Sequence, residues 1–273
     1  MPRLGFRQEY NLSSTMSRSS VLSSLFVMLL LAGCNAAVDT PEALLQQQHE
    51  RWYRGEDYAV TFVQQTIMHR QDGRTDTTLW YEAGMLGKLR IDFAPIGAGN
   101  GMLFRDGKRF ILRGGAVVRE DSERNPLQLV LMDALVQPVS TTLLELTQLG
   151  FDVTQLSEAD WKGRPAYVIG NRSDEEMDVD SVRVMHPQIW VDQSTLHTVR
   201  ILTPIAGSTS SLLDVHVDAY TPIAGTEHES RLSFYMDNRL FQEEIYTELR
   251  FRDPLPESLF DPDAWTPVSP YWE

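Results

Sequence analysis

The sequence predicts an α+β fold: an incomplete antiparallel β-barrel, made of one large curved sheet of about ten or eleven strands, with a helical lid. Apolar and polar residues alternate with a period of two along much of residues 58–252, which is typical of antiparallel strands with one wet and one apolar face. Asp-Gly and Gly-Gly pairs mark tight turns between these runs. Two apolar segments with helix signals interrupt the strands between residues 125 and 150, and they can cover the apolar face.

Residues 1–33 have the pattern of a secretory signal peptide. Three arginines precede a continuous apolar run over residues 25–31, and small residues follow it. The run is too short to span a bilayer core of roughly 30 Å, which needs about 20 residues. An ordinary signal followed by an incidental cysteine is the alternative reading, and Met16 offers a second candidate start.

The end of this signal, Leu31-Ala32-Gly33-Cys34, resembles the lipobox of bacterial lipoproteins, and Cys34 is the only cysteine of the chain. The resemblance implies cleavage before Cys34, lipidation of its sulfur, and a short tether over residues 34–39. Two or three acyl chains on one cysteine would anchor the chain far more firmly than one. Asn35 stands where an aspartate favours the inner membrane, so the resemblance implies an outer-membrane lipoprotein that faces the periplasm.

The composition predicts a single domain over residues 40–273. The chain is 42% hydrophobic with a formal net charge of −14, and a surface this acidic repels nucleic acid and anionic headgroups. Since no cysteine remains beside Cys34, the domain must be held by packing rather than by disulfides.

The first elements follow in order from Thr40. Thr40 as N-cap and Pro41 at the first helical position predict a helix to about Arg54, with Gly55 after its end. Alternation and turn signals then predict a run of strands. Their ranges are 58–69, 75–82, 88–93, 101–105 and 108–113.

Asn125-Pro126 begins the predicted lid. Residues 127–136 are apolar almost all round, so a single buried face cannot accommodate them. Ser140 is the predicted N-cap of a second helix that Gly150 ends. Two interpretations stay open: the segment is a lid that moves or meets a ligand, or it is helical filling of the core.

Strands resume after the lid. Their predicted ranges are 152–157, 164–170, 181–192, 196–203, 212–219 and 245–252. The remaining segment, residues 254–273, is proline-rich and is predicted to lie extended over the surface.

Catalytic motifs are absent from the sequence: it holds no Gly-x-Ser-x-Gly, no His-Glu-x-x-His and no phosphate loop. A hydrolase is therefore a remote hypothesis, and no cofactor is expected. His216 between Asp214 and Asp218, and the acidic run over residues 174–180, could bind a metal, but solvated charges are the favoured interpretation of both.

Seven segments, taken in order, resemble the LolA/LolB superfamily, the carriers and receptors of outer-membrane lipoproteins. They are residues 62–65, 79–81, 87–95, 103–108, 125–127, 163–168 and 187–192. The resemblance implies an incomplete barrel with a helical lid that binds acyl chains. The chain differs from the carriers at residues 82–86, where the carriers tend to have Arg-Pro. A lid-latching arginine is therefore not expected there. The lipobox favours a tethered receptor over a soluble carrier.

The functional hypothesis is a membrane-anchored protein that binds the acyl chains of a lipid or lipoprotein, acting in lipid or lipoprotein sorting with a periplasmic carrier or envelope protein as partner. The alternative is a regulatory or assembly lipoprotein of the same fold, similar to the sigma-factor regulator RseB, with a protein client. Large apolar residues expected on the inward face are the candidate lipid contacts: Phe62, Leu79, Leu89, Ile91, Phe93, Met102, Phe104, Leu131, Leu135, Leu143 and Trp190.

Overall fold

The computed structural model describes residues 38–172, 186–205, 212–252 and 255–266. Val38–Glu273 is a compact unit with its own hydrophobic cores. The predicted signal peptide, Cys34 and the acidic run over residues 174–180 lie outside the described residues. Within the described residues, no helix is both long enough and apolar enough to cross a membrane.

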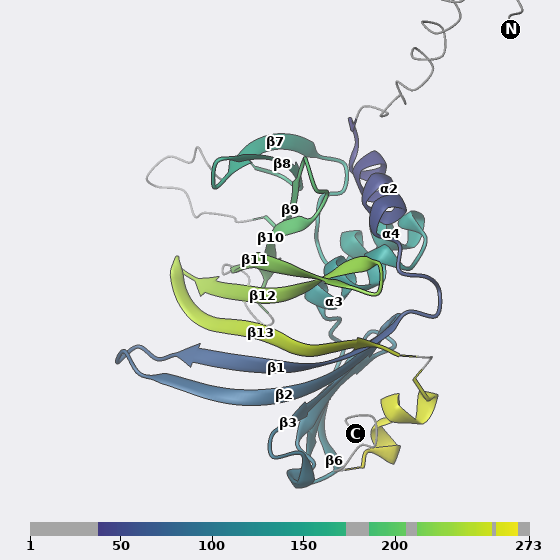
Figure 1. The fold of residues 1–273 in the computed structure, drawn as a ribbon, viewed down its shortest axis with the longest axis vertical. Coiled ribbons are helices and arrows are strands. Elements are labelled where there is room, and N and C mark those ends of the chain that lie inside the picture. Colours follow the sequence, from purple (N-terminus) through teal and green to yellow (C-terminus); the bar gives the residue numbers. More distant parts are fainter. Residues whose placement is uncertain (1–37, 173–185, 206–211, 253–254, 267–273) are drawn as a thin grey trace, which may run out of the picture. The chain divides into compact units, whose positions relative to one another are not determined.

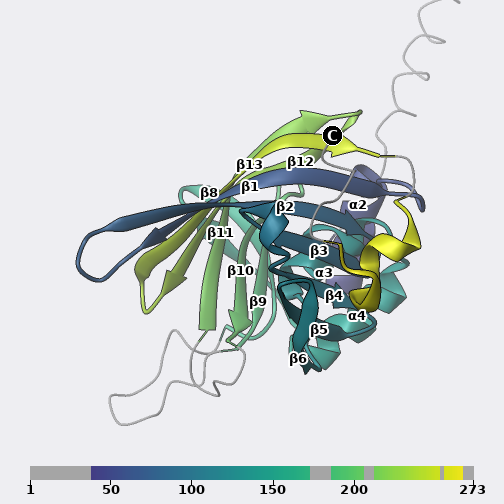
Figure 2. The same cartoon turned by 90° about the horizontal axis from the view of Figure 1, so that it is seen from below.

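The described residues form one antiparallel sheet of thirteen strands, which curves strongly in Figures 1 and 2. The strands are β1 (Ala59–His69), β2 (Thr75–Met85), β3 (Lys88–Phe93), β4 (Gly101–Arg105), β5 (Lys108–Arg113), β6 (Ala116–Asp121), β7 (Leu156–Trp161), β8 (Arg164–Ile169), β9 (Gln188–Asp192), β10 (Thr198–Pro204), β11 (Leu212–Ile223), β12 (Thr226–Met236) and β13 (Arg239–Phe251). The expected curved antiparallel sheet is confirmed, but the predicted count of ten or eleven is too low, because β6 and β12 were not predicted.

The strand order makes the sheet an unclosed barrel. Strands that are consecutive in sequence pair with each other, except β6 and β7, and β1 also pairs with β13, which joins the two halves. β6 and β7 are the two edges, and the chain passes from one to the other through its helical segment.

Each helix begins at an identifiable residue. α2 (Pro41–Trp52) starts where the Oγ1 atom of Thr40 accepts the Ala43 amide at 3.1 Å, and it ends two residues before the predicted end. α3 (Pro126–Leu131) starts at Asn125, whose side chain accepts two amides, and the 3₁₀ turn η2 (Asp133–Leu135) continues it.

The predicted N-cap of the next helix is wrong. α4 (Val139–Gln148) begins after Pro138, whose carbonyl accepts the amides of Thr141 and Thr142, and Ser140 lies in the first turn. Proline fixes the backbone at the entry and so sets the start of the helix without a side-chain cap.

The three α-helices lie against the inner face of β8–β12 and fill it (Figure 1). Leu44 of α2, Leu129 of α3 and Leu146 of α4 pack in one buried cluster with Ile201 and Leu232 of the sheet. All five side chains are at most 1% exposed. This half of the sheet therefore has an ordinary close-packed core.

The C-terminal segment corrects two predictions. It does not lie extended over the surface: the turns η4 (Glu257–Phe260) and η5 (Pro262–Ala264) bury Phe260 and Trp265 against Leu103 and Leu112 on the outer face of β4 and β5. The outer face here is consequently not wet, although its alternation predicted a solvated surface.

A buried ion pair lies under this segment. Arg90 and Asp92 of β3 alternate with the inward apolar residues and so lie on the face expected to be wet, yet each side chain is 1% exposed. Their Nε and Oδ2 atoms are 2.7 Å apart. The Arg90 guanidinium also donates to the carbonyls of Leu259 and Thr266 and lies 3.7 Å over the ring of Trp265. These interactions satisfy the charge that the C-terminal segment removes from water.

Candidate functional site: an apolar cavity with an acidic wall

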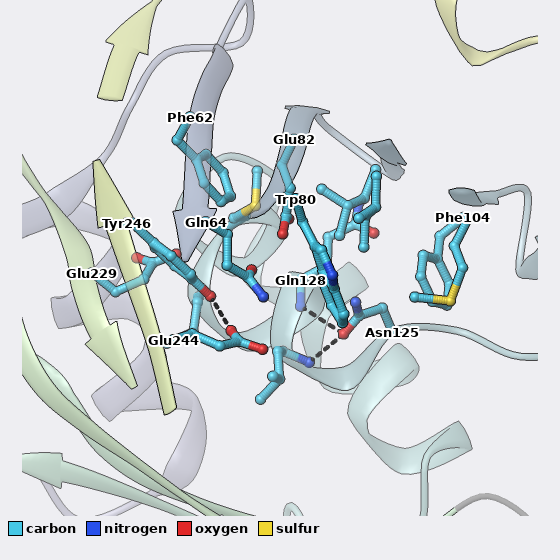
Figure 3. Close-up of a pocket in the computed structure, with 16 residues that line it drawn as sticks. Phe62, Gln64, Trp80, Glu82, Phe104, Asn125, Gln128, Glu229, Glu244 and Tyr246 are labelled. Atoms are coloured by element: carbon cyan, nitrogen blue, oxygen red, sulfur yellow. Dashed lines mark hydrogen bonds between the residues drawn. The ribbon is translucent and has the colours of Figure 1, made fainter. Parts of the chain in front are cut away.

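A cavity of about 130 Å³ lies between α3 and the inner face of β1–β4 (Figure 3). Here the helical segment approaches the sheet through Met132. A Cβ atom at Gly84 of β2 would collide with the Met132 side chain, so the glycine permits this close approach. Met132 also lines the cavity.

One wall of the cavity is apolar. Six of the predicted lipid contacts line it: Phe62, Leu89, Ile91, Met102, Phe104 and Leu131. The strand register explains the grouping, since Leu89 pairs with Phe104 and Ile91 pairs with Met102 across β3 and β4. Neighbouring residues on adjacent strands point to the same face, so the inward alternation predicted for β3 is confirmed.

Five predicted contacts lie elsewhere. Phe93 packs beside the apolar wall against Trp80, with ring centroids 4.9 Å apart. Leu135 lines a separate small pocket near α2, and Leu143 packs against the core beneath the helices. Leu79 is 40% exposed on the outer face of β2, because its neighbour Trp80 is the residue that faces the cavity.

Trp190 also faces outward, contrary to the prediction. It packs with Ala166, Val168 and Val199 on the side of β9 opposite to the core beneath the helices. Trp161 and Arg200 lie against its ring. His216, predicted to lie on a solvated strand face, packs edge-on against Trp161 at 4.8 Å and pairs with Asp214 at 3.3 Å. The described residues hold no group of three or more histidine, cysteine or acidic side chains placed to bind a metal.

The lining also includes polar side chains, which sequence reasoning missed. Glu82 lies between Phe62 and Ile91 of the neighbouring strands, and we call Glu82, Glu229 and Glu244 the acidic wall. Glu82 of β2, Glu229 of β12 and Glu244 of β13 line the cavity together with Gln64 and Gln128 (Figure 3). The three glutamates are only 3–6% exposed. Ionised carboxylates are costly to bury without cations, so three in one cavity is an unusual arrangement.

Burial changes the titration of two of these glutamates. Removal from water raises the pKa of Glu82 well above its ordinary value, and the nearby carboxylates of Glu244 and Glu229 raise it further. Burial raises the pKa of Glu244 to about 7, although its side chain accepts hydrogen bonds from Tyr246 at 2.7 Å and from Gln242 at 2.6 Å. Near neutral pH, this wall therefore holds protons that ordinary glutamates would have released.

Of the three glutamates, Glu229 has a cation beside it. The Arg54 guanidinium lies 3.6 Å from its carboxylate, and Arg54 also donates to the Tyr58 hydroxyl and the Glu227 carbonyl. His228 lies 3.5 Å from the same carboxylate, but burial lowers the pKa of its imidazole.

A second cavity of about 250 Å³ adjoins the first at the start of α3. The two share Phe104, Asn125 and Gln128 as lining residues. The second is bordered by charged side chains of both signs, among them Lys88, Lys108, Glu123 and Asp133. Asn125 and Gln128 therefore stand between an apolar space and a charged one.

The helical segment is fastened to the sheet beside this second cavity. Asp133 of η2 accepts the Gly87 amide of the β2–β3 turn at 3.0 Å and pairs with Arg124 at 3.4 Å. Arg124 also pairs with Glu145 of α4 at 2.5 Å. Burial raises the pKa of Asp133 to about 6, although its hydrogen bond to Gly87 and the charge of Arg124 lower it. We call Gly87, Arg124, Asp133 and Glu145 the latch.

Comparison with solved structures places this architecture among known ones. A LolA superfamily protein from Nitrosomonas europaea matches with a TM-score of 0.51 and 15% identity over 81% of this chain and 97% of its own. A DUF1329 family protein from Desulfovibrio piger matches with a TM-score of 0.54 and 13% identity over 83% and 98%. A putative outer membrane lipoprotein-sorting protein domain from Vibrio parahaemolyticus matches with a TM-score of 0.51 and 12% identity over 81% and 95%.

Comparison at the level of sequence gives no matching family model and no matching curated protein. At 12–15% identity, the structural matches concern the fold. The unclosed antiparallel sheet with its covering helices is the LolA-like fold expected from the order of the sequence segments.

Proposed function

We propose that this chain is a lipid-anchored envelope protein that binds the acyl chain of a lipid or lipoprotein in the cavity between α3 and β1–β4. The observation that carries the proposal is the apolar wall beneath α3. There, large apolar side chains such as Leu89 and Phe104 border empty space.

The two adjoining cavities together are large enough for one acyl chain that extends past α3. Ligand pockets are typically about 300–1,000 Å³, and the cavity of about 130 Å³ is smaller than that. With the adjoining cavity of about 250 Å³, the space reaches the lower end of this range. An acyl chain that passes Asn125 and Gln128 would occupy both cavities. Release of the latch would enlarge the passage between them.

The predicted lipidation of Cys34 supports a site of action at a membrane. An anchored domain with an acyl-binding cavity would receive or present cargo at the membrane, on the periplasmic side of the outer membrane, rather than carry it through the periplasm. One of the similar folds is described as an outer membrane lipoprotein-sorting domain, which is consistent with this role.

Native mass spectrometry of the full chain, extracted from membranes, tests the proposal. We expect a species that carries a bound lipid in addition to the covalent anchor. Leu89→Trp fills the cavity and should abolish that species, whereas Leu79→Trp makes the same change on the exposed outer face and should leave it unchanged. Lipid-free spectra from all three proteins would refute acyl binding and favour the alternative of a protein client.

A further inference from the structure

The acidic wall is not needed to hold an acyl chain, so it requires an explanation of its own. Glu82, Glu229 and Glu244 project into the same cavity from three strands (Figure 3). Lysine and arginine are absent from the residues that line it in the described part of the chain. An apolar ligand without a polar end would leave these carboxyl groups buried and uncompensated.

The charges around the cavity do not balance. Arg54 lies beside Glu229, but Glu82 and Glu244 form no ion pair with any residue that the structure describes. The hydrogen bonds of Glu244 come from Tyr246 and Gln242, which are neutral and supply no positive charge. The Oε1 atom of Glu82 is buried and has no hydrogen-bond partner.

A second unpartnered atom lies in the same cavity. Gln128 of α3 is 5% exposed, and its Nε2 atom has no hydrogen-bond partner. The Oε2 atom of Glu229, 3.6 Å from the Arg54 guanidinium, is a third such atom. Buried polar groups in folded proteins are almost always hydrogen-bonded, so three unsatisfied side chains in one cavity point to a polar ligand. Two of the three atoms are carboxyl oxygens, which when ionised require a donor on the ligand, whereas Gln128 is itself a donor that an ammonium does not satisfy.

We propose that the cavity selects an amphiphile whose apolar chain ends in an ammonium group, with Glu82 and Glu244 as the acceptors for its N–H donors. This inference rests on the proposed function and specifies the class of ligand. The apolar chain of the ligand would lie against Leu89 and Phe104, and its ammonium group would displace the protons of the acidic wall. Since no lysine or arginine lines this cavity among the described residues, a phosphate beside the ammonium would not be accommodated.

Photolabelling of the full chain in nanodiscs tests the inference. Three probes share one dodecyl chain with a diazirine and differ in their end group, which is an ammonium, an alcohol or a carboxylate. We expect the ammonium probe to label the cavity peptides about tenfold more than the alcohol at equal concentration, which corresponds to about 1.4 kcal/mol. The carboxylate probe should label them least. Lysophosphatidylethanolamine should compete with the ammonium probe less well than unlabelled dodecylammonium does.

Two variants distinguish recognition by the acidic wall from a general attraction of the ammonium to an acidic protein. E82Q/E244Q should reduce the ammonium-to-alcohol ratio to about one while it retains labelling by the alcohol. Glu243→Gln removes the neighbouring carboxylate, which pairs with His69 and Arg231 away from the cavity, and should leave the ratio unchanged.

The outcomes distinguish the two proposals. Saturable alcohol labelling without a preference for the ammonium would overturn the present inference and leave acyl binding intact. Absence of cavity labelling by all three probes would overturn acyl binding itself. Equal ratios in the wild type, E82Q/E244Q and Glu243→Gln would show that Glu82 and Glu244 do not recognise the ligand.

Discussion

The two halves of the sheet bury their inner faces in different ways. On β8–β12, the helices fill the concave face, and residues such as Ile201 and Leu232 are completely buried. On β1–β4, the cover is the short α3 and η2, and Leu89 and Phe104 border a cavity. One curved sheet thus provides a rigid support in one half and an unfilled space in the other. A ligand is therefore expected to bind in the half where the packing is incomplete.

Matched truncations in the two halves should show the largest difference. Leu232→Ala opens a new void in the filled half and should lower the free energy of unfolding by about 3–5 kcal/mol. Leu89→Ala enlarges a space that already exists and should cost about 1–2 kcal/mol, since fewer contacts are lost. Urea unfolding measures both. Equal losses would contradict the view that only one half is close-packed.

The acidic wall should make the stability of the cavity half depend on pH. The pKa of Glu244 is raised from 4.5 to about 7 in the folded chain, so folding binds a proton between these values and stability falls as pH rises through them. At pH 8, Glu244→Gln should therefore stabilise the chain by up to about 3 kcal/mol. At pH 4, where the carboxyl is protonated in both states, the gain should vanish.

Thermal unfolding across this pH range measures the effect. Glu243→Gln on the outer face is the matched control, because its neighbours Arg231 and His69 lower the pKa of that carboxyl. Because Glu243 forms stabilising ion pairs, Glu243→Gln should lower the stability at pH 8, whereas Glu244→Gln should raise it. A Glu244→Gln gain that does not depend on pH would refute the assignment of a proton to the acidic wall.

Loss of the latch should have the smallest of these effects on stability, and its effect on motion should be local. Arg124→Met removes the cation that Asp133 and Glu145 share and should cost about 1–2 kcal/mol. Hydrogen exchange should quicken in α3 and η2, while β8–β12 keeps its protection. Uniform quickening across both halves would show that Arg124 supports the whole fold and not the helical cover of the cavity.

Much of the fold could be predicted from local signals. Thr40-Pro41 and Asn125-Pro126 mark helix starts through backbone chemistry, and Asp106-Gly107 marks the β4–β5 hairpin, so these elements were placed closely. β6 and β12 were missed for opposite reasons. β6 is an edge strand exposed on both faces, and β12 buries Glu229 and His228 where apolar residues would be expected.

The face of a side chain was predictable only where polar and apolar residues alternate. Leu89 and Ile91 alternate with charged residues, and their inward direction follows. Leu79 and Trp80 are both apolar, so the sequence does not say which one faces the cavity. The burial of Arg90 and Asp92 depends on residues 255–266, far along the chain, and periodicity within β3 carries no information about that cover.

The acidic wall could not be predicted because its members come from separate strands. Glu82, Glu229 and Glu244 are distant in sequence, and each has the residue type of an exposed position. Only the pairing of β1 with both β2 and β13 places the strands that carry Glu82 and Glu244 on the two sides of β1. A glutamate flanked by apolar residues in a strand, such as Glu82 before Ala83, was the single available signal.

The position of a cross-linked acyl chain tests most directly whether the cavity between α3 and β1–β4 is the binding site. A diazirine probe with a neutral end group, bound to the full chain and mapped by peptide mass spectrometry, should label residues 88–104 and 126–132, which border the cavity. Residues 189–202 and 213–217 of the filled half should remain unlabelled. Labelling of the filled half, or of the outer face around Leu79, would contradict the account of the cavity as the binding site.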